Sequence, residues 1–126
     1  MGVTQAVSPT AFFYMRYEVV KLDRRHSWCA QFAYMLVFSK STWQGTGVLD
    51  FDRSRRWMTT TWGWSQDVET RETLMKRKLD PANTAVQDED INQHWGYSIQ
   101  YNDYRIYLTG DKELSWFQLN YPVSHV

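Results

Sequence analysis

Histidine and cysteine are the residues of this chain best suited to acid–base, metal or nucleophilic chemistry. His26, His94 and His125 are scattered, with no HxH or HExxH pattern and no paired cysteines, so their spacing gives no metal signature. Cys29 lies in the apolar run WCAQFAYMLVF, where a free thiol behaves as a small hydrophobic group. We therefore expect neither a metal nor another cofactor.

His94 has the best sequence context for acid–base chemistry. It begins a predicted strand on the polar face, and the fold could bring it close to Asp50 or Asp52 to form a general acid–base pair. A surface histidine at a strand end is the commoner situation, and the acidic run 88–90 is typical of a solvated loop. Nucleophile motifs such as GxSxG or SxxK are absent from the sequence. These features favour a protein that is not an enzyme.

Basic residues cluster at 24–26, 53–56 and 76–78. The first two clusters fall in predicted turns next to Trp28 and Trp57, and arginines beside stacking rings are typical of proteins that hold single-stranded nucleic acid. The third cluster is explained by the C-terminus of a predicted helix. Because 14 basic residues are balanced by 14 acidic ones, nucleic-acid binding is the weakest of three functional hypotheses.

Aromatic residues are unusually abundant: 7 Trp, 8 Tyr and 6 Phe make up 17% of the chain. A thin two-layer domain cannot bury every one of these rings, and exposed Tyr, Trp and Arg are enriched at binding hot spots. The leading hypothesis is therefore a non-enzymatic binding domain whose aromatic and arginine-bearing face meets a protein partner or a second copy of the chain. The residues assigned to this face are Trp62, Trp64, Tyr97, Arg105, Tyr107 and Arg56.

Trp62 and Trp64 have two interpretations. Residues two apart on a strand point to the same face, so the two indoles could stack together on a ligand. They could equally cover the seam between the sheet and the following helix, and because tryptophan is mostly buried in proteins this second interpretation is favoured.

A small-molecule site, catalytic or not, is the second hypothesis. Aromatic side chains would line a pocket inside a curled sheet, with a polar group to orient the ligand. The residues assigned to this pocket are Trp43, Trp57, Trp95 and Trp116, with His94 as the polar group.

The elements that must position these residues are mostly strands. A chain of 126 residues fits a single domain spanning residues 1–126. Hydrophobic alternation and β-branched or aromatic content predict strands in the segments 11–22, 28–39, 41–52, 56–64, 94–101, 104–109 and 113–121. One helix is predicted near residues 66–79, with Ser65 as N-cap, acidic residues in the first turn and basic residues in the last.

These elements predict an α+β, mostly β fold. It would be a single antiparallel meander of about seven strands, forming a curled sheet or partial barrel with the one helix inserted. The start of the chain lacks a basic region followed by an apolar one, and the apolar runs fall short of the ~20 residues of a membrane span. We therefore expect a soluble, cytoplasmic protein without membrane contact, and self-association is favoured by the zero net charge.

Overall fold

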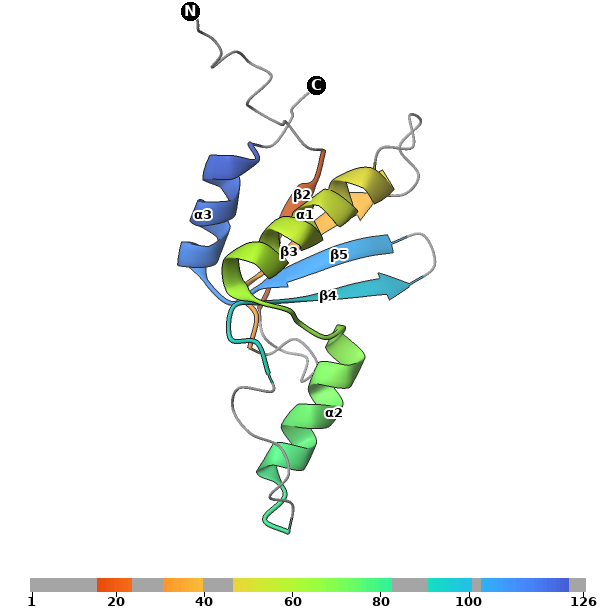
Figure 1. Cartoon of the computed structure of the whole chain (residues 1–126), viewed down its shortest axis with the longest axis vertical. Coiled ribbons are helices and arrows are strands. Elements are labelled where there is room, and N and C mark those ends of the chain that lie inside the picture. Colours follow the sequence, from red (N-terminus) through yellow and green to blue (C-terminus); the bar gives the residue numbers. More distant parts are fainter. Residues whose placement is uncertain (1–15, 24–30, 40–46, 83–90, 101–102, 123–126) are drawn as a thin grey trace, which may run out of the picture.

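The computed structural model describes residues 16–23, 31–39, 47–82, 91–100 and 103–122 (Figure 1). Its sheet contains β2 (Glu18–Lys21), β3 (Tyr34–Ser39), β5 (Asp103–Leu108) and β4 (Trp95–Gln100), in the spatial order β2-β3-β5-β4. Every neighbouring pair of these strands is antiparallel. The helices are α1 (Gly47–Trp62), α2 (Val68–Leu79) and α3 (Asp111–Asn120).

The predicted meander of about seven strands is wrong. The described residues form a 4-stranded sheet, although the α+β class is consistent with the structure. The predicted strand at 56–64 gives way to α1, as does the part of the predicted strand 41–52 that the structure describes; residues 41–46 lie outside the described residues. The predicted strand at 113–121 is replaced by α3. The predicted helix is confirmed as α2, but its N-cap is Asp67, whose side chain accepts a hydrogen bond from the Thr70 backbone N–H at 3.0 Å.

The main core lies between the sheet and the pair α1 and α3. Alternate residues of β3 and β5 point to this side, including Leu36 and Ile106, which are fully buried. They pack against Phe51 of α1 and Phe117 of α3, and Figure 1 shows α1 crossing the sheet. α1 and α3 therefore cover one face of the sheet, as expected for an α+β layer architecture.

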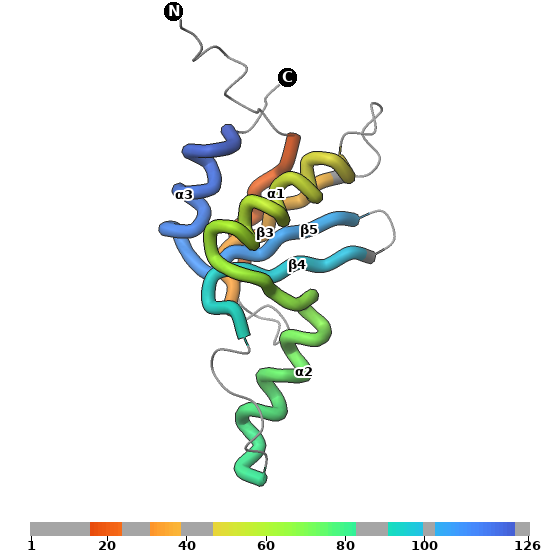
Figure 2. The backbone as a smooth tube through the Cα atoms, viewed as in Figure 1, coloured from red at the N-terminus to blue at the C-terminus, as the bar shows by residue number. Residues whose placement is uncertain are grey.

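A smaller cluster lies on the opposite face of the sheet. Phe32, Val68 and Tyr107 form it, so the first turn of α2 packs on the side away from α1. Gly96 makes this possible, because a Cβ at that position would lie only 3.0 Å from the Phe32 ring. Figure 2 shows the chain leaving α1 beside β4 and continuing into α2, which points away from the sheet. None of the helices in the described segments has the length and apolar character needed to span a membrane.

Candidate functional site

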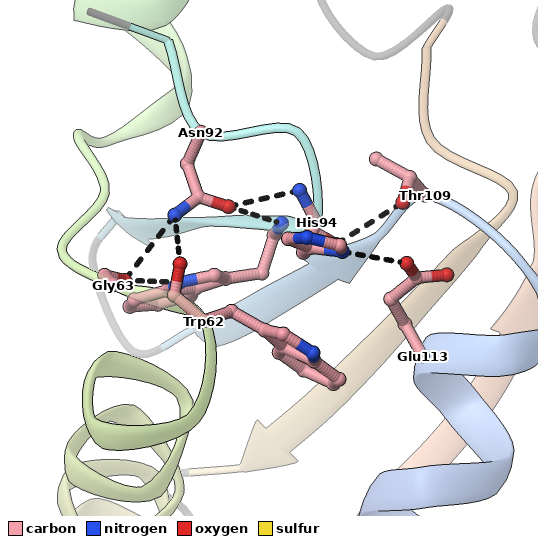
Figure 3. A network of polar contacts seen from close by, with 7 residues as sticks. Trp62, Gly63, Asn92, His94, Thr109 and Glu113 are labelled. Atoms are coloured by element: carbon pink, nitrogen blue, oxygen red, sulfur yellow. Dashed lines mark hydrogen bonds and ion pairs between the residues drawn. The ribbon is translucent and has the colours of Figure 1, made fainter. Parts of the chain in front are cut away.

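His94 lies in a network of polar contacts between α1, β4 and α3 (Figure 3). Its Nδ1 atom is 2.8 Å from Oε2 of Glu113, a side chain that is only 10% exposed. The imidazole is 39% exposed and stacks on the indole of Trp62, with ring centroids 5.6 Å apart. The carboxylate and the indole together fix the position of the imidazole, which leaves a partly exposed ring held in one orientation.

Asn92 joins this network to the end of α1. Its amide nitrogen donates to the carbonyls of Trp62 at 2.8 Å, Gly63 at 3.3 Å and Trp64 at 3.2 Å. Its amide oxygen accepts from the backbone N–H groups of His94 at 2.8 Å and Trp95 at 3.2 Å. These contacts satisfy carbonyls that a helix end leaves without intrahelical partners.

Gly63 lets the chain turn at this point. Its φ of +92° lies in the left-handed region that favours glycine, and its N–H donates to the Thr59 carbonyl at 2.9 Å. The Gly63 carbonyl accepts a further hydrogen bond from the Trp95 indole at 2.8 Å. The pair of tryptophans around Gly63 thus ends a helix, where the sequence predicted a strand.

An imidazole oriented by a buried carboxylate has the geometry of an acid–base group. The structure pairs His94 with Glu113, whereas Asp50 accepts a hydrogen bond from the Arg16 backbone N–H at 3.3 Å. In the described segments no group of His, Cys, Asp and Glu could hold a metal ion. Most hydrogen bonds of the network end on backbone atoms, so we interpret it as a structural junction between three elements.

The six residues assigned to a binding face do not share one face. Arg56 is exposed on α1, and Tyr97 on the same side of the sheet lies beneath the Arg55 guanidinium at 4.2 Å from its ring centroid. Tyr107 is buried on the opposite side. The remaining three are Trp62, which packs against the main core, Trp64, which is 68% exposed, and Arg105, which is paired with Asp103 at 3.0 Å.

The residues assigned to an aromatic pocket are also dispersed. Trp95 is buried in the main core, while Trp57 packs against Trp62 with ring centroids 5.1 Å apart. Trp116 is exposed on α3. Trp43 lies outside the described residues. The structure therefore connects Trp57 and His94 only indirectly, through the Trp62 ring that touches both.

The described residues form two hollows that sequence reasoning did not find, and one of them borders β4. One has a volume of about 340 Å³ and is lined by Asp67, Val68, Glu69, Tyr97, Ser98 and Ile99. The other, about 520 Å³, lies along α1 and is lined by Asp52, Arg55, Arg56, Thr59 and Thr60. Arg55 of the second hollow contacts Tyr97 of the first, with its guanidinium 4.2 Å from the ring centroid, and we call the two hollows together the β4 groove.

The outer edge of β4 is covered along its first half, because the Ser65 hydroxyl donates to the Trp95 carbonyl at 2.8 Å and Asp67 bridges Tyr97. Natural edge strands are shielded by charges, prolines, bulges or a covering loop or helix, and from Ser98 onward β4 has no charge or proline. The other edge strand, β2, follows this rule because Glu18 and Lys21 are exposed at its two ends. β4 has the sequence WGYSIQ, without charge or proline, and Ile99 is 48% exposed. In the described segments β4 pairs with β5 and forms a single parallel bridge between Tyr97 and Asp67 on its other side.

Arg71 is a buried cation close to this edge. Its guanidinium lies over the Phe32 ring at 4.8 Å from the centroid, and the Nε and Nη1 atoms have no hydrogen-bond acceptor. Burial lowers the pKa of Arg71 to about 10, because the charged form loses its hydration in apolar surroundings. The side chain therefore brings an uncompensated charge under the first turn of α2.

Comparisons with protein-family models, curated proteins and solved structures gave no match to this chain. Function must therefore be argued from the geometry and chemistry of the site. The two candidate sites are the His94 junction and the β4 groove. They differ in which polar groups remain available to a ligand. The junction directs its polar atoms at the backbone of the chain, whereas the groove lies beside the stretch of the β4 edge that follows the bridge at Tyr97.

Proposed function

We propose that this protein is a non-enzymatic binding domain that takes up an extended segment of a protein partner along the outer edge of β4. The observation that carries the proposal is the part of the β4 edge beyond the bridge at Tyr97, which has no charge or proline and borders a hollow. Unpaired backbone N–H and C=O groups at such an edge are a template for another strand. Recognition by strand addition uses these backbone groups for affinity and nearby side-chain hollows for specificity.

The short bridge between Asp67 and Tyr97 supports this mode of binding. An extended stretch of the chain itself already lies against β4 at that position. Beyond the bridge, Ser98 and Ile99 continue the strand and line the hollow of about 340 Å³. A partner segment would therefore extend a pairing that the fold has begun.

A second copy of the chain fits this edge less well than a single segment. A two-fold dimer with β4 paired to β4 would bring the same flank of α1 from each copy together, because symmetric interfaces use one surface twice. Arg55 and Arg56 line that flank, so like charges would face one another. In Figures 1 and 2, α2 also projects from the β4 side of the sheet, where a second sheet would have to continue.

The first test measures binding of a neutral strand-forming peptide of about ten residues, made of Thr, Val and Gln and labelled with fluorescein, by fluorescence anisotropy. Replacing Ile99 with Lys places a charge on the open edge and should weaken peptide binding at least about tenfold. Leu119→Lys is the matched control, because Leu119 is an exposed apolar residue of α3. This control should bind the peptide like the wild type.

Two results would contradict the proposal. Equal peptide affinity of Ile99→Lys and Leu119→Lys would show that the β4 edge is not the binding surface. Light scattering after size-exclusion chromatography provides the second check. A wild-type dimer that Ile99→Lys converts to a monomer would assign the edge to a second copy instead of a partner segment.

A further inference from the structure

We propose that the partner segment carries acidic side chains at alternate positions, where they bind Arg55 and Arg56 of α1. This inference rests on the strand addition to β4 proposed above. It assigns a charge pattern to the ligand that strand pairing alone would not require, because backbone hydrogen bonds are largely indifferent to side-chain charge.

Arg55 and Arg56 have no carboxylate partner in the part of the chain that the structure describes. Asp52 lines the same hollow and lies within four residues of both arginines on the helix, yet it forms an ion pair with neither. Arg53, by contrast, has its carboxylate neighbour, since it lies 3.9 Å from Asp50. The cations on the groove flank of α1 are therefore open to an external anion.

Arg55 is also held in position. Its guanidinium lies 4.2 Å from the centroid of the Tyr97 ring and 5.5 Å from that of Phe51, and its Nε atom is buried without an acceptor. Stacking on aromatic rings fixes the plane of the guanidinium, so that less side-chain entropy is lost when it binds a carboxylate. A planar fork that is already oriented suits the two oxygens of a carboxylate.

The alternation follows from the geometry of an added strand. Successive side chains of a strand point to opposite faces, so every second residue of the segment would face α1. The intervening residues would face the first turn of α2, where Asp67 and Glu69 line the hollow. Acidic residues at these intervening positions would be repelled. The pattern that fits is therefore an acidic residue followed by a neutral or basic one.

The test compares labelled peptides of about ten residues that share a Thr/Val background and carry Glu, Gln or Lys at every second position. The Glu peptide should bind the wild type about tenfold more tightly than the Gln peptide, and the Lys peptide should bind most weakly, because two guanidinium–carboxylate contacts form in the first case. The preference for Glu should decline as salt is added, since exposed charges are screened.

Arg56→Gln and Arg55→Gln should each reduce the difference between the Glu and Gln peptides, because each removes a guanidinium that a carboxylate of the Glu peptide would bind. Arg56 is the cleaner position, because it is exposed and its replacement removes no ring contact. Arg77→Gln, an equal charge change in the exposed last turn of α2, is the control and should preserve the difference. Circular dichroism would show that each variant is folded.

The outcomes separate this inference from the binding function. If the Glu and Gln peptides bind equally and Ile99→Lys removes both, strand addition stands and the acidic pattern is refuted. If no peptide binds, or Ile99→Lys has no effect, both proposals fail. If an oligothymidine competitor displaces the Glu peptide at lower concentration than the unlabelled Glu peptide does, the arginines serve phosphate recognition and the acidic segment is refuted.

Discussion

Arg71 illustrates how a single side chain can lower stability while filling space. It reaches from α2 across β4, and its Cδ atom would lie 3.7 Å from a Cβ at Gly96. The aliphatic part of the side chain and the contact with the Phe32 ring contribute packing. The charge itself has no acceptor for Nε and Nη1, and a buried ion without a partner costs free energy.

Replacing Arg71 with Met should therefore raise the free energy of unfolding by about 1 kcal/mol at neutral pH. The pKa of Arg71 is lowered from its ordinary value to about 10 in the folded protein, so above about pH 10 the unfolded chain binds more protons than the native one. The free energy of unfolding of the wild type therefore rises with pH above about 10. The difference in this free energy between Arg71→Met and the wild type should shrink over the same range. Urea unfolding at a series of pH values measures both effects.

Arg77→Met is the control for this prediction, because Arg77 is an exposed residue of the same helix. It should change stability by less than about 0.5 kcal/mol. A loss of stability in Arg71→Met would mean that the contact between the guanidinium and the Phe32 ring outweighs the lost hydration.

At the scale of elements, the helices and strands that could be predicted are those whose own sequence carries end signals or hydrophobic alternation. α2 has an acidic first turn and a basic last turn, and the alternation in HWGYSIQY predicted a strand where β4 lies. α1 was missed because its buried face includes polar Ser54, whose hydroxyl donates to the Asp50 carbonyl at 2.8 Å one turn earlier. Threonines 59–61 also favour a strand by intrinsic propensity, which tertiary packing overrides here.

α3 was missed for a related reason. Glu113 is buried at its start, while Trp116 and Leu119 are exposed. When all apolar residues of this segment are assumed to be buried, their spacing indicates the period of a strand instead of that of a helix. The burial of Glu113 depends on His94, which lies far away in the sequence, so no local pattern could reveal it.

Asn92 provides the test at this scale, since its side chain connects α1 to β4. Asn92→Ala removes an amide that contacts three consecutive carbonyls and two backbone N–H groups, and should reduce the free energy of unfolding by about 2 kcal/mol. Asn120→Ala is the control, because its amide donates to the Trp116 carbonyl at an exposed position. Thermal and urea unfolding of both variants would check the prediction, and equal effects would contradict it.

At the scale of the whole molecule, the candidate site depends on strand order. β5 lies between β3 and β4, and this order leaves β4 at an edge next to α2. Tyr97 and Arg56 were predicted as binding residues and line the β4 groove, but Arg105 and Tyr107 lie on the other face of the sheet. Sequence composition could suggest that aromatic and arginine side chains bind something. Non-local pairing decides which of them share a surface.

The arrangement of the cores predicts which parts unfold together. Phe117 is fully buried between α3 and the sheet, whereas Leu79 at the end of α2 is 76% exposed. Phe117→Ala should lower the free energy of unfolding by about 3 to 5 kcal/mol, because it leaves a cavity in the main core. In hydrogen exchange this loss should appear equally in α1, β3 and β5, whose slowest amides exchange through global unfolding.

Leu79→Ala is the matched change at an exposed position and should leave those amides as protected as in the wild type. The last turn of α2 should exchange rapidly in every variant, because Arg77, Lys78 and Leu79 are all exposed and local fraying suffices to open their amides. If Phe117→Ala reduced protection in α3 alone, α3 would be a separate unit docked on the sheet. The shared core of α1, α3 and β3 argues instead that one cooperative unit supports the β4 edge, so that the edge can be tested by surface substitutions without unfolding the domain.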